Sequence, residues 1–188
     1  MSEASSSPSP SGDETRLSPV EFRAYNRLAD HMEMFHNHFR LAWNELYRAC
    51  TDRNDEDLEF LSTRRLIQLG LRFCSQLGVH HSIEEVNIFP VLAARMPEFR
   101  PGESALLAQH ERIHEGMDRM EAYLTRCLRG KMGEENKQED QFRLEEVKRL
   151  MDGFGEVLWT HLDEEVRTLR AENMRRYWTM DEMRRLPI

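Results

Sequence analysis

The chain has 188 residues, of which 39% are hydrophobic and 32% charged, enough for one domain with a core of useful size. Its formal net charge is −8 and no basic face stands out, which argues against a nucleic-acid partner, because phosphate binding needs clustered Lys and Arg. No apolar run approaches the length that spans a bilayer. We therefore expect a globular protein that binds neither nucleic acid nor membrane.

The first 18 residues begin with MSEASSSPSPSGDETR, which is rich in Ser and Pro and lacks the basic and apolar regions of a secretory signal. Residues 1–18 are therefore predicted to be a disordered tail, and the protein is predicted to be cytoplasmic. The three cysteines Cys50, Cys74 and Cys127 include no CxxC pair, so we expect them to fill core volume rather than to bind zinc or to do redox work.

Four long amphipathic helices follow the tail. Residues 18–21 read as a capping box with proline at the first helical position, and they begin a helix over about 19–50. Apolar residues at steps of three and four continue in three further stretches, over residues 66–91, 106–124 and 147–169. In the second stretch the predicted stripe passes through Ile88 and Val91 before Pro97 ends the helix.

The polar segments TDRNDED and GKMGEENKQED separate these helices, and no strand-like alternation or long repeat is present. The sequence therefore predicts an all-α fold, an up-down-up-down four-helix bundle over residues 19–172. Residues 173–188 are expected to form a short C-terminal helical extension, docked on the bundle by Tyr177 and Trp178.

All eight histidines fall inside the four predicted helices, and several lie four residues from a second histidine or a glutamate. Residues four apart on a helix lie about 40° apart around it, so both side chains point to one region of space. Each such pair lies on an apolar stripe, which faces the axis of a bundle. The pairs are His80 with Glu84, His110 with His114, and His161 with Glu165.

A single histidine on an apolar stripe is more often a core residue than a metal ligand, but buried glutamates are different. An unpaired buried carboxylate is costly, and no Lys or Arg lies on these stripes to compensate two of them. A metal cluster would supply the positive charge. Imidazole with carboxylate and without thiolate suits iron or manganese, with zinc as a further candidate.

Each helix offers more than one register for these ligands. On the first helix, Phe39 marks the buried face and favours His36 over His38. On the second helix, the stripe through Phe73 favours His80 over His81.

Residues next to the predicted metal ligands are expected to orient them without binding the metal themselves. His81 and Glu85 lie one residue out of register with His80 and Glu84. On the fourth helix, the four-residue spacing favours Glu165, so Glu164 is also expected outside the ligand set.

The strings FHNHFR, HHSIEEVNIFP, QHERIHEG and WTHLDEEV, in this order over roughly residues 20–172, resemble the hemerythrin/HHE cation-binding family, and in detail the fungal hemerythrin-like proteins. The resemblance implies a hemerythrin-like bundle with a non-haem, oxo- or hydroxo-bridged di-iron centre. Five histidines would be terminal ligands and two carboxylates would bridge the irons. HLDEE follows the HHE pattern and differs from the invertebrate oxygen carriers, whose last carboxylate is an aspartate placed differently. Carried over by position, the ligands are His36, His80, Glu84, His110, His114, His161 and Glu165.

Two functions fit such a centre. In the first, the protein binds O2, NO or iron as a sensor, scavenger or store, and is a monomer or weak dimer. The alternative is a di-iron enzyme, an oxygenase, an oxidase or a Lewis-acid catalyst, acting on a small organic substrate as in fungal metabolite pathways. A histidine-rich shell donates less negative charge than the carboxylate-rich shells of bundle oxygenases, which favours reversible binding. The sequence identifies no substrate pocket and leaves open whether the protein is an enzyme.

Overall fold

The computed structural model describes residues 16–51, 62–130 and 141–186, and within these ranges the chain is helical and contains no strand. The predicted all-α class is thus confirmed for the described residues. In chain order the elements are α1 (Pro19–Thr51), α3 (Thr63–Ile83), the π-helix η1 (Glu84–Ile88), α4 (Phe89–Ala93), the 3-10 helix η2 (Pro97–Phe99), α5 (Ala105–Gly130), α6 (Leu144–Thr168), α7 (Ala171–Tyr177) and α8 (Met180–Met183).

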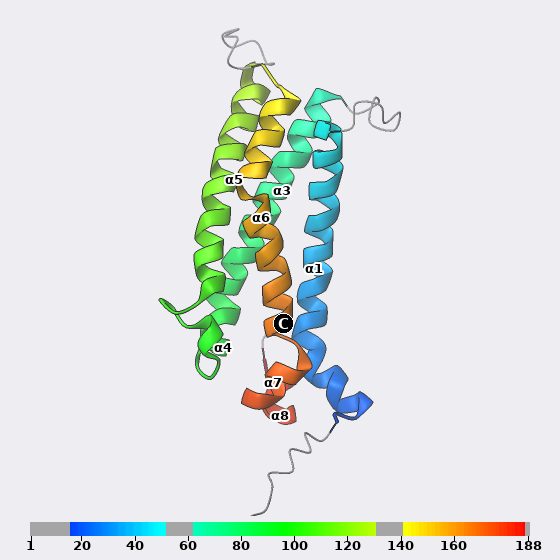
Figure 1. Ribbon diagram of the computed structural model, residues 1–188, viewed down its shortest axis with the longest axis vertical. Coiled ribbons are helices and arrows are strands. Elements are labelled where there is room, and N and C mark those ends of the chain that lie inside the picture. Colours follow the sequence, from blue (N-terminus) through cyan, green and yellow to red (C-terminus); the bar gives the residue numbers. More distant parts are fainter. Residues whose placement is uncertain (1–15, 52–61, 131–140, 187–188) are drawn as a thin grey trace, which may run out of the picture.

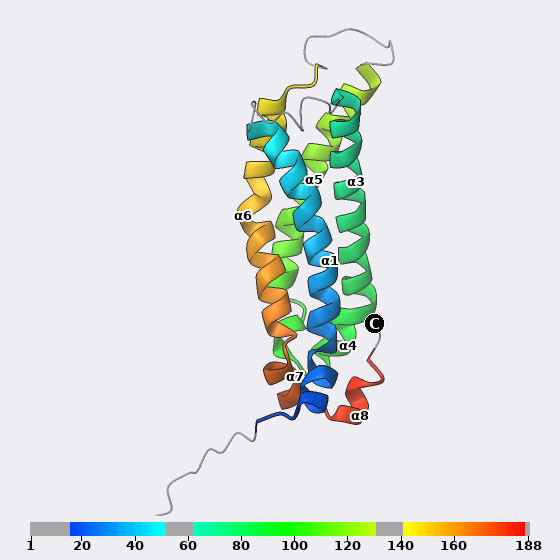
Figure 2. The same cartoon turned by 90° about the vertical axis from the view of Figure 1, so that its right-hand side faces the viewer.

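The four long helices α1, α3, α5 and α6 lie side by side along the long axis of the molecule (Figures 1 and 2). Helix α1 packs against α3 and α6, and α5 packs against the same two helices, so the four enclose a common interior. The colours in Figure 1 show that successive long helices run in opposite directions along this axis. The short helices α4, α7 and α8 gather at the end where α1 begins.

The start of α1 is fixed by the predicted capping box. The backbone N–H of Ser18 donates to Glu21 Oε2 at 2.9 Å, and the N–H of Glu21 donates to Ser18 Oγ at 3.3 Å. Both donors would otherwise lack a partner in the first turn of the helix. The predicted tail and the two predicted polar connections lie mostly outside the described residues.

Two separate apolar clusters fill the interior. The first, here the upper core, contains residues such as Phe39, Leu77 and Phe154, and the second, the lower core, contains residues such as Phe89 and Leu169. Helices α1, α5 and α6, and the continuous segment from α3 through η1 to α4, pass from one cluster to the other, and at the crossing they place polar side chains in the interior. We call this set the polar layer: His36, His80, His81, Glu84, His110, His161 and Glu165, each less than 9% exposed.

Close approach of α5 and α6 depends on glycine. A Cβ added at Gly116 would lie 2.5 Å from the side chain of Phe154, closer than carbon atoms tolerate. Glycine at this position therefore lets the upper core close directly above the polar layer.

The cysteines lie where the sequence predicted. Cys74 and Cys127 are buried in the upper core, and Cys50 packs partly against it. Burial raises the pKa of the Cys74 thiol to about 12, so it stays protonated and unreactive at neutral pH.

The second predicted helix differs from the observed one, which widens into a π-helix at Glu84–Ile88. The N–H of Phe89 donates to the carbonyl of Glu84, five residues back. Pro90 has no N–H to donate and its ring crowds the preceding turn, which disfavours regular α-helical bonding here. The extra residue in this turn rotates the following side chains around the helix axis. Phe89 is therefore buried, while Val91 is 38% exposed.

The predicted stripe was therefore wrong at Val91, since a regular helical period cannot anticipate an inserted residue. Ile88 packs partly against the lower core, and Phe89 and Leu92 are buried in it.

The C-terminal segment docks on the lower end of the bundle, as expected, although as two short helices. Trp178 is buried in the lower core, and Tyr177 packs partly against it. The guanidinium of Arg95 lies 4.7 Å from the Trp178 ring and pairs with Glu182 at 2.6 Å. None of the helices in the described ranges is long and apolar enough to cross a bilayer.

Candidate metal centre

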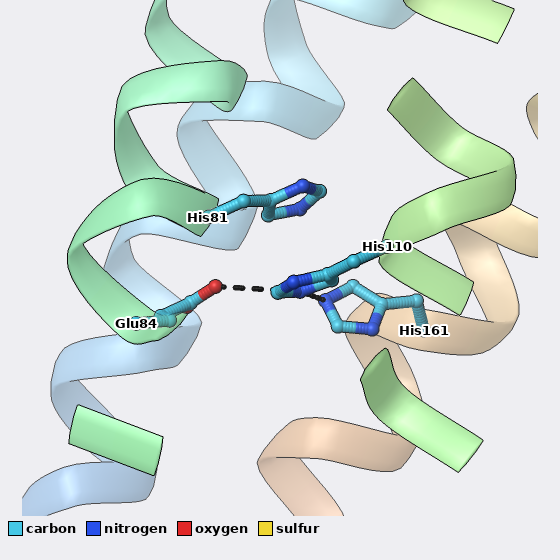
Figure 3. Close-up of side chains that lie close together, drawn as sticks. All are labelled: His81, Glu84, His110 and His161. Atoms are coloured by element: carbon cyan, nitrogen blue, oxygen red, sulfur yellow. Dashed lines mark hydrogen bonds and ion pairs between the residues drawn. The ribbon is translucent and has the colours of Figure 1, made fainter. Parts of the chain in front are cut away.

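The polar layer brings its donor atoms together in two groups. Within each group, one donor atom from every residue lies within 4.8 Å of the others. The first group comes from α3, η1, α5 and α6, and Figure 3 shows its side chains pointing toward one another. The first group is His81, Glu84, His110 and His161, and the second group is His36, His80, Glu84 and Glu165.

Glu84 belongs to both groups. Its Oε1 lies 2.9 Å from His80 Nε2 in the second group, while its Oε2 lies 3.5 Å from His110 Nε2 in the first. One oxygen therefore faces each group. This residue opens the π-helix, so the irregular turn carries the carboxylate that the two groups share.

Glu165 also lies between the groups. Its Oε2 is 3.2 Å from His36 Nε2 in the second group and 3.6 Å from His161 Nε2 in the first. Both carboxylates are completely buried. Two acidic side chains thus flank a common region in the middle of the protein.

Four of the surrounding imidazoles, those of His80, His81, His110 and His161, are neutral at pH 7. Burial lowers the pKa of His80 to about 4 and that of His161 to about 3, because the charged ring loses its hydration. Burial also lowers the pKa of His81 and of His110. Neutral imidazole is the form that binds metal ions, and it cannot neutralise a carboxylate.

In the described ranges, no Lys or Arg supplies positive charge to the two carboxylates. Burial, reinforced by the charge of Glu165, raises the pKa of Glu84 well above its ordinary value. Burial acts on Glu165 in the same direction, but contact with His36 and with neighbouring imidazoles outweighs it and lowers the Glu165 pKa. In the described part of the chain, only histidines lie within ion-pair distance of either glutamate.

Most of the nitrogen and oxygen atoms that face into the two groups have no hydrogen-bond partner. Although the nitrogen–oxygen distances are short, these atoms are not aligned as donors and acceptors, and a buried polar atom without a partner is costly. The distances between 2.9 and 3.6 Å resemble the spacing of about 3.0–3.4 Å between neighbouring ligands of an ion bound at about 2.1 Å. The donors present therefore fit a dinuclear metal centre. The orphaned atoms are Nε2 of His36, His80 and His81 and both carboxylate oxygens of Glu84 and Glu165.

Contacts on the far side of the rings fix which nitrogen faces inward. His36 Nδ1 lies 3.0 Å from the Leu162 carbonyl, and His110 Nδ1 lies 2.7 Å from Glu85 Oε1. Both partners only accept hydrogen bonds, so Nδ1 carries the proton and donates it. The Nε2 lone pair of each ring then points into its group, as in metal-bound histidines.

His161 is held in the same way by a residue that the sequence did not single out. Its Nδ1 lies 3.2 Å from Gln109 Oε1, and Gln109 Nε2 donates to Glu164 Oε2 at 2.6 Å. The only signal for Gln109 was its place directly before His110 in QHERIHEG. Glu85 and Glu164, predicted as orienting groups, thus lie outside the two donor groups. Glu85 contacts the His110 ring directly, and Glu164 contacts Gln109, which holds the His161 ring.

His81 and His114 lie opposite to the sequence prediction, which made His114 a ligand and placed His81 outside the ligand set. His81 lies in the first group, whereas His114 lies outside both, with its Nε2 3.0 Å from His81 Nδ1. A helix flanked by two neighbours buries a face wide enough for adjacent residues, so His80 faces the second group and His81 the first. The ligand role of His114 stays a prediction.

The other two histidines lie at the margin of the site. His38 Nε2 is 3.3 Å from Gln76 Oε1, an exposed contact between α1 and α3, and His31 packs edge-on against Phe35. Neither joins a donor group in the described residues. His36 is the residue of α1 that enters the polar layer.

A helical protein with buried imidazoles and carboxylates gathered in this way belongs to the class of metal-binding helical proteins. The model of the hemerythrin HHE cation binding domain matches residues 27–171, a stretch that includes every residue of the polar layer. The chain belongs to the hemerythrin HHE cation-binding family, which confirms the resemblance seen in the sequence. Comparisons with curated proteins and with solved structures gave no match.

Proposed function

We propose that the polar layer holds two iron ions and that the protein binds O2 or a related diatomic molecule there. The observation that carries this proposal is the pair of donor groups that share Glu84. Most of their inward-facing atoms, including both oxygens of each carboxylate, have no hydrogen-bond partner. Two groups with one shared carboxylate suit two ions better than one. We also infer that the long helices, which alternate in direction, form the up-down-up-down bundle of the hemerythrin type.

Iron is the metal we favour because the donors are imidazole and carboxylate without thiolate. Manganese suits the carboxylates and zinc suits the imidazoles, so both are weaker alternatives. Bound iron would supply redox chemistry and an open coordination position for a diatomic ligand.

The residues of this chain supply the rest of the site. Leu162, Glu85 and Gln109 hold three imidazoles with their lone pairs facing inward. The upper and lower cores close the layer from both ends and limit its access to water.

The donor set contains many histidines and few carboxylates, so it supplies little negative charge to stabilise highly oxidised iron. This favours reversible binding of a diatomic molecule over its activation. We therefore propose a sensor, scavenger or store. A cytoplasmic location and a monomeric or weakly dimeric state complete the proposal, and both come from the sequence alone.

The visible spectrum of the iron-loaded protein tests this function. Reduced protein is exposed to O2, degassed and exposed again. An absorption band that appears with O2 and disappears on degassing over several cycles is expected. One-way oxidation, with no return on degassing, would contradict reversible binding.

A second candidate, a di-iron enzyme, is favoured by one observation. An apolar cavity reaches His80 and Glu84 from the surface between α1 and α3. One-way oxidation that becomes faster when an organic substrate is added would support the enzyme.

A further inference from the structure

A cavity of about 740 Å³ lies between α1 and the α3–η1 segment. Its outer walls are apolar and include Met34 and Phe35 from α1 and Val79 and Ile83 from α3. These four side chains are between 39% and 58% exposed, an unusual concentration of apolar surface on one side of the bundle. The cavity is therefore an accessible site rather than a sealed packing defect.

The inner wall of this cavity belongs to the second donor group. His80 and Glu84 both line it, although they are almost completely buried. The ring of Phe35 lies 5.5 Å from the His80 ring, and the ring of Phe39, also in the wall, lies 5.0 Å from it. A molecule in the cavity would thus sit against two residues of the candidate metal centre.

The lining also indicates the chemistry of that molecule. It includes no Lys or Arg, and its one carboxylate is Glu84 at the inner end. Along these walls an anionic ligand would lose its hydration without meeting a Lys or Arg side chain. The polar groups Ser75, Gln76 and Asn87 supply a few hydrogen-bonding positions among apolar walls, the usual pattern of a small-molecule pocket of this volume.

We infer that this cavity binds a neutral, largely apolar small organic molecule and presents it to the metal centre beside His80 and Glu84. Binding of the molecule in the cavity does not depend on the proposed function. Only its presentation to the metal centre rests on the proposed metal site. A protein partner or a second copy of the chain could cover the exposed rim at Val79 and Ile83. It would leave the depth of the cavity unfilled, which favours a small molecule.

The test uses trifluoromethylbenzene, a neutral apolar probe, observed by ¹⁹F NMR with the full-length protein. The protein is prepared metal-free, loaded with diamagnetic Zn²⁺ and loaded with paramagnetic Mn²⁺, and the metal content of each sample is measured. We expect saturable binding to all three preparations. We also expect strong broadening of the bound probe signal with Mn²⁺ alone, because a paramagnetic ion next to the cavity speeds relaxation.

Two variants and one control locate the probe. Val79→Trp fills the cavity and Met34→Glu places a charge in its wall; both positions are exposed, at 58% and 57%, so neither substitution disturbs the core. We expect at least tenfold weaker binding in both. Leu41→Trp, on α1 at a position that is 71% exposed and does not line the cavity, should bind the probe as the wild type does.

Each failure has a distinct signature. Equal probe affinity in Val79→Trp, Met34→Glu and wild type would overturn the inference. Binding without broadening in Mn²⁺-loaded protein would overturn its second half, presentation to the metal. A wild type that takes up no metal would contradict the proposed function, while the variants still decide the cavity in metal-free protein. A dimer that sedimentation detects in wild type but not in Val79→Trp, with no probe binding, would assign the face to a second copy.

Discussion

The Nε2 atoms of His110 on α5 and His161 on α6 lie 3.1 Å apart in the middle of the bundle. Each ring donates its Nδ1 proton outward, to Glu85 and to Gln109, so both Nε2 atoms carry lone pairs that face each other. Two lone pairs at this distance repel unless a cation lies between or beside them. The pair is therefore the clearest sign that the site is built around positive charge.

Replacing His110 by alanine should remove metal and lower the melting temperature of the metal-loaded protein. Metal bound only by the folded state stabilises it by about 4 kcal/mol when free metal exceeds the Kd a thousandfold, which corresponds to roughly 8–16 °C for a chain of this size. Elemental analysis and thermal unfolding measure the two effects. His38→Ala is the control, since His38 lies in neither donor group in the described residues and should leave both values unchanged. A His110→Ala protein that kept two metal ions and its melting temperature would show that the donor groups are wrong.

His81 and His114 give opposite predictions that separate the structure from the sequence pattern. Because His81 lies in the first group and His114 outside it, His81→Ala should lower bound metal below two per chain, whereas His114→Ala should keep two. Metal content after desalting decides the matter. The reverse result would mean that His114 coordinates, as the sequence resemblance implies, and that His81 only supports it through the 3.0 Å contact between the rings.

The sequence predicted most of the polar layer because its chemistry follows the helical period. His36, His80 and Glu165 fall on apolar stripes, and the structure buries all three. The width of the buried face could not be inferred from one stripe, so His81 was placed outside the centre.

The remaining differences are not local properties of the sequence. The π-helix that begins at Glu84 lies just before Pro90, whose ring and missing N–H disfavour regular α-helical bonding, and a period of 3.6 residues cannot show it. Gln109 contacts His161 across two helices, which only the folded chain reveals.

The metal-free protein should lose stability on acidification. The pKa values of His80 and His161 in the folded protein, about 4 and about 3, lie below the ordinary value of 6.5, so the unfolded chain takes up protons first. Their contribution is complete above about pH 6.5 and declines as the pH falls toward these values, by up to about 1.4 kcal/mol per pH unit for each histidine. The raised pKa of Glu84 opposes this loss, but His81 and His110 add to it.

Thermal unfolding of metal-free protein between pH 7.5 and pH 5 measures this effect. We expect the melting temperature to fall over the lower part of the range. A melting temperature that is constant or rises from pH 6.5 to pH 5 would contradict neutral buried imidazoles.

Two glycines in the long helices should respond oppositely to alanine. A Cβ at Gly116 would lie 2.5 Å from Phe154, so Gly116→Ala should destabilise the protein by about 1–3 kcal/mol through overpacking. Gly78, on α3, has nothing within 4 Å of the added carbon, so Gly78→Ala should stabilise by up to about 1 kcal/mol through helix propensity. Denaturant unfolding compares both with wild type. Equal and small effects would mean that α5 and α6 can separate at little cost.

The most direct measurement counts iron in the wild-type protein. Metal-free protein is reconstituted with Fe²⁺ under anaerobic conditions, excess metal is removed by gel filtration, and iron and protein are measured on the same sample. Two donor groups that share Glu84 predict two irons per chain. A chain that keeps one iron, or none, would contradict a dinuclear centre in the polar layer.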